Sequence, residues 1–197
     1  MDFTKPKVLG LDISTKTIGW ALFDWQSEEL LELTHFTPKI KPQPEDKIEL
    51  LLKKSDAFAE KLEEIKNLGV LKVIVEEPLL TSNNVYTVGT LLRYNSMIVK
   101  TVHDVLDLTP HFISTYNSRK FAYPHLYKEN KNKKKVLFGG YPKGCNKKQI
   151  IWEEVESREP KIEWLYTRND TLKKECYDMA DAYTCVKGYM KQEGIWG

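Results

Sequence analysis

Short apolar runs alternate with turn-forming residues over the first 36 positions of the chain. Residues 7–12 and 18–25 are apolar, β-branched or aromatic, and the polar sequence STKT separates them. Residues 30–36 form a third run of this kind. Runs of this length bounded by turn residues are typical of β-strands, and such short connections favour antiparallel pairing. We therefore expect a three-stranded antiparallel meander.

Helical periodicity then alternates with two further strand patterns. Residues 45–68 place apolar side chains on one helical face, and residues 84–106 do the same. Between these helices, the segment VLKVIVEE predicts a buried strand that Pro78 ends, because proline cannot continue a central ladder. Residues 111–116 predict a short strand.

Two closing helices complete the pattern. They are expected at residues 146–156 and 170–192, with Asp170 as the cap of the second. This order of elements predicts an α/β fold with a mixed sheet, in which an antiparallel meander adjoins parallel strands and helices cover both faces. No composition shift divides the chain, so we expect residues 1–197 to form a single domain with a basic loop at about 117–148.

The second helix has an apolar face that is wider than one sheet can cover. Val85, Val88, Leu92 and Val99 lie on one stripe, and a second apolar stripe runs beside it. We expect a subunit interface on this face, with deep burial in a monomer as the alternative.

Charge is distributed unevenly along the chain. The formal net charge is +2, but residues 119–148 hold ten Lys or Arg against the single acid Glu129, a local charge of +9. The remainder therefore carries −7. A basic segment beside an acidic body favours a polyanionic partner, with a solvated loop as the alternative. Lys133, Lys134 and Lys135 lie in its most basic stretch, KENKNKKK.

Composition and residue spacing argue against a membrane span, a secreted protein and a zinc site. Hydrophobic residues make up 41% of the chain, and no run approaches the roughly 18 apolar residues of a membrane span. The start MDFTKPK leads directly into the first strand, which leaves no room for a signal sequence, so we expect a cytoplasmic, non-secreted protein. The three cysteines and four histidines lack the spacing of a zinc site.

Four acidic residues recur at comparable places in the pattern. Asp12 ends the first strand, Glu76 ends the VIV strand, and Asp178 and Asp181 project from one face of the last helix at i, i+3. Taken singly, a strand-end Asp is often a turn former, and helix acids at i, i+3 usually form a solvated face. Clustered carboxylates raise one another's pKa unless a cation intervenes, and oxygen-only ligands favour Mg²⁺ or Mn²⁺. Strand alternation allows only one of Glu76 and Glu77 to face such a site, and we choose Glu76.

A pair of such ions about 3.5 to 4 Å apart can activate a water and stabilise the leaving oxygen of a phosphodiester. The acidic pattern therefore predicts Mg²⁺, replaceable by Mn²⁺, with two ions in the active site. We name Asp12, Glu76, Asp178 and Asp181 as both metal ligands and catalytic residues.

The acidic segments resemble the motifs of the RuvC-type Holliday-junction resolvases, which have an RNase H-like fold. DISTKTIGW is similar to the opening motif, VIVEEP to the second, and DMADAY to the last. Ile13 and Ser14 replace the usual Pro-Gly of the opening motif, and the segment between Tyr116 and Lys143 is longer and more basic than is typical.

The same resemblance implies residues that contact nucleic acid. KKQII resembles the element carrying one functional lysine, which implies Lys147 with Lys148 beside it, and the other cation is implied at Arg119 or Lys120. Some resolvases place a hydrophobic wedge three residues after the glutamate, which falls on Leu79. Aromatic residues in the basic segment could stack on unpaired bases or pin the segment to the body.

The resemblance implies a homodimer that holds a four-way DNA junction and nicks two opposing strands with magnesium. Our hypothesis is a metal-dependent, structure-selective endonuclease acting on branched DNA. The alternatives are an RNA-processing nuclease of the same fold and a noncatalytic junction-binding protein. GLDISTKTIGW also resembles the first phosphate loop of actin-like kinases, but 197 residues are too few for two such lobes and no second glycine-rich loop follows.

Overall fold

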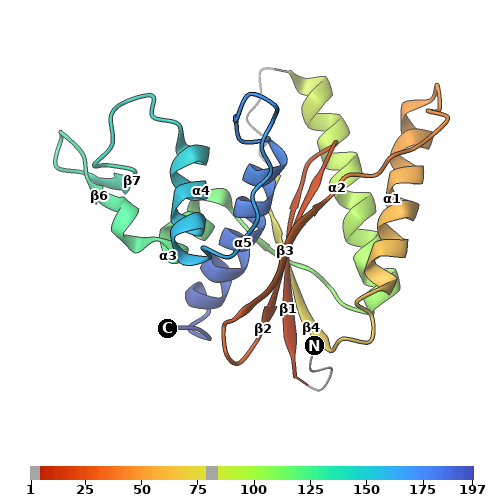
Figure 1. Cartoon of the computed structure of the whole chain (residues 1–197), viewed down its shortest axis with the longest axis horizontal. Helices are drawn as coiled ribbons and strands as arrows, with labels where there is room; N and C mark the ends of the chain where they lie inside the picture. Colours follow the sequence, from red (N-terminus) through yellow and green to blue (C-terminus); the bar gives the residue numbers. More distant parts are fainter. Residues whose placement is uncertain (1–4, 79–83) are drawn as a thin grey trace.

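A five-stranded mixed sheet with helices on both faces organises the molecule (Figure 1). The computed structural model describes residues 5–78 and 84–197. The strand order is β3-β2-β1-β4-β5, in which β1, β2 and β3 are antiparallel and β4 and β5 run parallel to β1. The expected meander and mixed sheet are thereby confirmed. The strands are β1 Lys7–Ile13, β2 Ile18–Asp24, β3 Leu30–Phe36, β4 Val70–Glu76 and β5 His111–Ile113.

Two helical layers enclose this sheet. Figure 1 shows α1 (Lys47–Glu63) and α2 (Val85–Leu106) on one face, and α3 (Thr115–Ala122), α4 (Lys147–Arg158) and α5 (Glu175–Gln192) on the other. The helices α1, α2 and α4 lie where the sequence predicts them. No helix in the described part of the chain has the length and apolarity needed to cross a membrane.

The last helix begins later than the sequence pattern suggests. Asp170 has a left-handed backbone, with φ of 53°, and lies in a turn in which the Thr167 amide donates to the Thr171 carbonyl. An isolated bridge between Tyr166 and Leu172 closes this turn. The prediction that Asp170 caps the helix is therefore wrong. Asp170 instead serves a turn, a role that Asp also favours because it tolerates the left-handed region.

The segment expected to be a basic loop has regular structure over much of its length. The Ser114 side chain accepts a hydrogen bond from the Asn117 amide, so the chain leaves β5 and enters α3 at once. A 3₁₀ turn, η1 (Pro124–Leu126), follows, and then a hairpin of β6 (Tyr127–Glu129) and β7 (Lys135–Leu137). The predicted strand at 111–116 is correspondingly shorter, because a capping serine stops it.

The core consists of two clusters, one on each face of the sheet. Side chains alternate along β1, so Val8 packs with α5 whereas Leu9 and Leu11 pack with α1 and α2. Every residue of β2 is buried, because both of its faces are covered. These buried central strands are the rigid base on which the acidic residues are placed.

Two glycines allow α5 to lie directly against the central strands. A Cβ on Gly19 would overlap the Asp178 carbonyl, and a Cβ on Gly10 would overlap the Ala182 carbonyl. Gly19 pairs with Asp12 across β1 and β2. The missing side chain at Gly19 thus brings the α5 backbone at Asp178 up to the strand pair that carries Asp12.

Candidate metal centre

The four predicted acids converge at one edge of the sheet. Asp12 lies near the end of β1 and Glu76 ends β4, and because these strands are parallel neighbours their C-terminal ends meet. Helix α5 crosses this edge and contributes Asp178 and Asp181. All four line one pocket of about 260 Å³. The i, i+3 spacing on α5 does place both aspartates on the side that faces the strands.

Three of the four carboxylates form a tight group. Ligand oxygens of Asp12, Glu76 and Asp181 all lie within 4.8 Å of one another. Oxygens around a single octahedral Mg²⁺, at about 2.1 Å from the ion, lie about 3 to 4.2 Å apart, so small side-chain rotations would suffice for shared coordination. Asp178 stands outside this group of three and faces Lys148 instead.

Two cations neutralise part of this charge. An Arg119 Nη2 donates to Asp181 Oδ1 at 2.9 Å, and both side chains are buried. Lys148 Nζ lies 3.3 Å from Asp181 Oδ2 and 3.7 Å from Asp178 Oδ1. The Lys148 side chain is 51% exposed, so its ammonium group can be reached from solvent.

The neighbouring candidates point elsewhere. Lys147 Nζ lies 5.8 Å from the centre of the Phe138 ring, and Lys120 Nζ lies over the rings of Phe121 and Tyr127. In each pair of adjacent cations, the structure therefore brings one to the acidic residues: Arg119 rather than Lys120, and Lys148 rather than Lys147. Lys120 and Lys147 do not line the acidic pocket.

Glu76 is the glutamate that enters the acidic group. The Thr115 hydroxyl, at the start of α3, donates a hydrogen bond to Glu76 Oε1 and holds this side chain in its orientation. Glu77 is exposed at the rim of the same pocket, and its amide donates to the Ile113 carbonyl at 2.9 Å. Strand alternation accounts for the difference, as expected.

Burial and mutual repulsion disfavour the ionised forms of these acids. The pKa of Asp12 is well above its ordinary value because of burial and of the charges on Glu76, Asp181 and Asp178. Burial and then Asp181 raise the pKa of Glu76 to about 7, against the opposing hydrogen bond from Thr115. Burial raises the pKa of Asp178 to about 6, and Lys148 counteracts part of this effect. The site therefore favours additional positive charge.

Protein freed of divalent ions should lose stability as pH rises from about 4.5 to 7. The folded state holds the Glu76 and Asp178 protons more tightly than the unfolded chain, whose values are near 4.5 and 3.8, so unfolding releases protons in this window. Saturating Mg²⁺ should offset the repulsion and raise the melting temperature by about 5 °C more near pH 7.5 than near pH 5.

Calorimetry in EDTA and in Mg²⁺ at both pH values measures this difference. Asp56, an exposed residue of α1, provides the matched control, because Asp56→Asn should keep the full effect of the ion whereas Asp12→Asn should lose most of it. An equal Mg²⁺ shift at the two pH values would contradict the prediction.

Thr115 was not anticipated from the sequence. It lies in the segment STY, which reads as the continuation of a β-branched strand, and only the capping role of Ser114 indicates a helix start there. Leu79, the predicted wedge, lies outside the described residues.

The most basic stretch is separate from the acidic pocket. Lys133, Lys134 and Lys135 are exposed at the turn and the second strand of the β6–β7 hairpin. A neighbouring pocket of about 600 Å³ is lined by hairpin residues and by Lys131, Lys143 and Lys147. None of these lysines lines the acidic pocket among the described residues.

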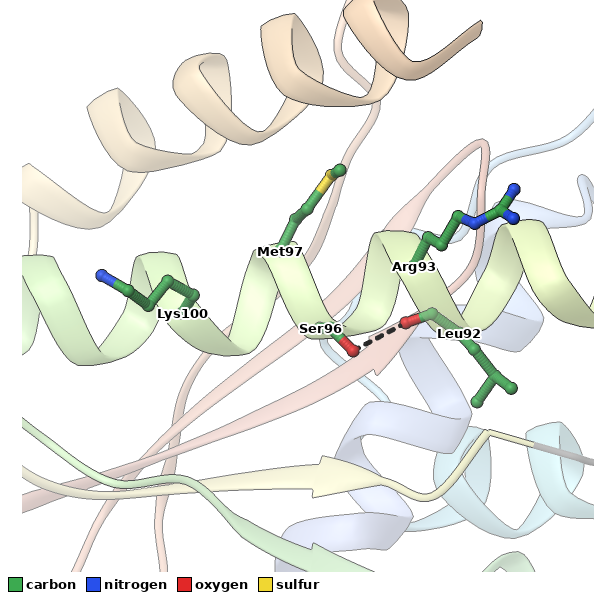
Figure 2. A pocket seen from close by; sticks show the side chains of 5 residues that line it. All are labelled: Leu92, Arg93, Ser96, Met97 and Lys100. Carbon is green, nitrogen blue, oxygen red and sulfur yellow. Dashed lines mark hydrogen bonds between the residues drawn. The ribbon is translucent and has the colours of Figure 1, made fainter.

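Another pocket, of about 490 Å³, lies on α2 and has no acidic lining among the described residues. Figure 2 shows its five lining side chains on this one helix, with Met97 directed toward α1 and the Ser96 hydroxyl bonded to the Leu92 carbonyl. The remaining lining residues are Arg93 and Lys100. Among the described residues, its lining therefore offers no carboxylate that could hold a metal ion.

Solved structures share this fold. RuvC from Thermus thermophilus aligns with a TM-score of 0.55 over 95% of this chain and 96% of its own, at 13% sequence identity. The same protein in complex with a Holliday junction substrate aligns with a TM-score of 0.57 over 96% of both chains, at 12% identity. The yeast mitochondrial Holliday junction resolvase Ydc2 gives 0.55 over 95% of this chain and 80% of its own, at 15% identity.

The expected RNase H-like fold of the resolvases is thereby confirmed. No family model matches the chain, and no curated protein matches it in sequence. The likeness therefore rests on architecture.

Proposed function

We propose that this protein is a metal-dependent endonuclease that cleaves DNA at four-way junctions or other branches. The observation that carries the proposal is the group of oxygens from Asp12, Glu76 and Asp181, gathered within 4.8 Å at one sheet edge. The fold that gathers them is shared with two proteins whose names identify them as RuvC and as a Holliday junction resolvase.

Asp12, Glu76 and Asp181 would hold divalent metal, with Asp178 completing the site for a second ion. Their hard oxygen donors suit Mg²⁺, and Mn²⁺ should substitute. Bound metal at such a site supplies Lewis-acid stabilisation of a phosphoryl oxygen and a water of lowered pKa.

The remaining residues have roles that follow from their contacts. Thr115 holds Glu76 in place, and Arg119 holds Asp181 from the buried side. Lys148 is half-exposed at the mouth of the pocket, so its ammonium group can bind a phosphate oxygen of the substrate. Lys147, Lys120 and the hairpin lysines would bind phosphates farther from the cleaved bond.

Neutralising the hairpin should weaken DNA binding without removing the chemistry. Replacing Lys131, Lys133, Lys134 and Lys135 by Gln removes four exposed positive charges. If they contact phosphates, the dissociation constant should rise about tenfold or more, and the slope of log K against log salt should become shallower by about 3. Anisotropy titrations of a labelled junction at several salt concentrations measure both. An unchanged salt slope would show that the hairpin lies away from DNA.

We further propose a homodimer joined through α2. Val85, Tyr86 and Leu92 of this helix are exposed, as is Phe112 on the edge strand β5. Two active sites on one dimer would suit a substrate with two strands to cut. Light scattering of the wild type and of Leu92→Glu tests this: the wild type should have the mass of a dimer and the variant that of a monomer. A monomeric wild type at micromolar concentration would refute the interface.

The decisive experiment incubates the protein with an end-labelled four-way junction, with and without Mg²⁺. Linear duplex, forked DNA and structured RNA serve as competing substrates in parallel reactions. Mg²⁺-dependent nicks in the junction, absent from linear duplex, are the expected result. Cleavage of RNA alone would instead establish an RNA-processing nuclease, and tight junction binding without cleavage a noncatalytic binding protein.

A further inference from the structure

A cavity of about 1150 Å³, larger than the pockets described above, lies beside the acidic pocket and has a predominantly basic lining. It is bounded by the β1–β2 turn, the end of β3, α1, the start of α4 and the segment leading into α5. Its volume is above the roughly 300–1,000 Å³ of typical small-molecule sites. Five lysines line it, against two carboxylates: Lys16, Lys54, Lys148, Lys173 and Lys174.

Several of these lysines lack an acidic partner. In the part of the chain that the structure describes, no ion pair is formed by Lys16, Lys173 or Lys174. Lys54 Nζ donates to the Thr15 carbonyl at 2.7 Å. Burial and then the charge of Lys16 lower the pKa of Lys54, so like charges face each other here. Such an arrangement is stabilised by an anion placed between the lysines.

The two cavities adjoin each other. Ser14, Lys148 and Asp178 line both the basic cavity and the acidic pocket. Lys148 lies between them, because its ammonium group is near Asp178 and Asp181 while its side chain also faces the basic cavity. A polyanion with one phosphate at the acidic pocket would therefore pass Lys148 and reach the other lysines of the basic cavity with its next phosphates.

We propose that this cavity binds the phosphate backbone of the nucleic-acid strand that continues directly from the acidic pocket. The inference rests on the proposed nuclease function and adds a binding surface to it. Lysines supplied by separate elements suit an extended chain of phosphates better than a single compact anion. Six serine and threonine residues add polar side chains to the lining, although the Ser14 and Thr171 hydroxyls already donate to backbone carbonyls. Tyr177 in the same lining adds an aromatic side chain, the kind on which bases stack.

This surface differs from the basic segment that the sequence makes conspicuous. Lys16, Lys54, Lys173 and Lys174 lie outside residues 119–148, in the part of the chain whose net charge is −7. Folding collects these scattered lysines around one cavity, which a count of charge along the sequence cannot reveal.

The test uses a triple variant of the whole 197-residue chain, with Lys16→Gln, Lys173→Gln and Lys174→Gln. Lys53→Gln is the matched control, because Lys53 precedes Lys54 on α1 but pairs with Glu49 and is absent from the cavity lining. Anisotropy titrations with a labelled four-way junction in Ca²⁺ should show about tenfold weaker binding for the triple variant and a salt slope shallower by about 2 to 3. Circular dichroism and melting temperature establish that each variant is folded.

Lysine acetylation footprinting on the wild type provides a measurement that does not depend on cleavage. Four-way junction DNA, single-stranded DNA, linear duplex and structured RNA are tested in turn. We expect Lys16, Lys173 and Lys174 to be protected and Lys53 to remain reactive. Protection by RNA alone supports the cavity as a nucleic-acid site while contradicting the DNA function.

The outcomes separate the two proposals. If the triple variant binds with wild-type affinity and salt slope while the wild type still nicks junctions, the cavity inference is wrong and the nuclease proposal stands. If none of the four nucleic acids protects these lysines, the inference is wrong whatever the cleavage assay shows.

Discussion

Asp12→Asn should abolish junction cleavage and leave junction binding nearly intact. Asp12 is one of the three carboxylates that meet within 4.8 Å, and replacing one of its oxygens by an amide nitrogen removes a charged metal ligand without changing side-chain volume. We expect the single-turnover nicking rate to fall at least about 10³-fold, a loss of about 4 kcal/mol of transition-state stabilisation. The rate is measured on a labelled junction in saturating Mg²⁺.

The same variant should fold as well as the wild type. Burial and neighbouring carboxylates disfavour the charged form of Asp12, so the neutral amide removes repulsion from the metal-free protein. Its melting temperature in EDTA near pH 7.5 should equal or exceed that of the wild type. Asp56→Asn, on the exposed side of α1, should change neither rate nor affinity. Nicking by Asp12→Asn at more than a tenth of the wild-type rate would exclude Asp12 as an essential ligand.

Much of the fold could be predicted because the local patterns and the final structure agree. The strands at 7–13 and 18–24 are long apolar runs, and burial on both faces requires such runs. The four acids could also be anticipated as a group, since two end parallel neighbouring strands and two lie three residues apart on a helix. The positions of the acids on their strands and helix were enough to predict the group, without knowledge of the distances between them.

Other features depend on contacts between distant segments. Lys147 and Lys148 are adjacent in sequence, and only the rotation of α4 against α5 decides that Lys148 faces Asp178 and Asp181. The packing of α3 distinguishes Arg119 from Lys120 in the same way, since Arg119 contacts Asp181 whereas Lys120 lies over the Tyr127 ring. Motif resemblance located these pairs but could not choose within them, because neighbouring helical residues differ by about 100° in direction.

Two element boundaries were predicted wrongly, and each lies at a short polar residue. Ser114 and Asp170 are of the type that serves helix caps and turns equally well. The chain uses Ser114 to start α3, where a strand was expected, and Asp170 in a turn, where a helix cap was expected. The first of these has a functional consequence, since an early α3 places Thr115 against Glu76 and Arg119 against Asp181.

Glu76→Gln should lower the nicking rate by about 10²-fold or more, whereas Glu77→Gln should change it by less than about threefold. Glu76 ends β4 and Glu77 follows it directly, but only the Glu76 carboxylate belongs to the group with Asp12 and Asp181. The amide retains an oxygen that can accept from the Thr115 hydroxyl, so the loss reports on the charge of the ligand more than on its position. Glu77 is exposed at the pocket rim.

A titration of the nicking rate with Mg²⁺ distinguishes this role from a structural one. If Glu76 holds metal, Glu76→Gln should need a higher Mg²⁺ concentration for half-maximal rate, and Thr115→Val should shift that concentration in the same direction by less. Glu77→Gln, matched in chemistry and differing by one position, should follow the wild-type curve. A larger loss of nicking rate for Glu77→Gln than for Glu76→Gln would mean that Glu76, the glutamate bonded to Thr115, is not the one that the reaction needs.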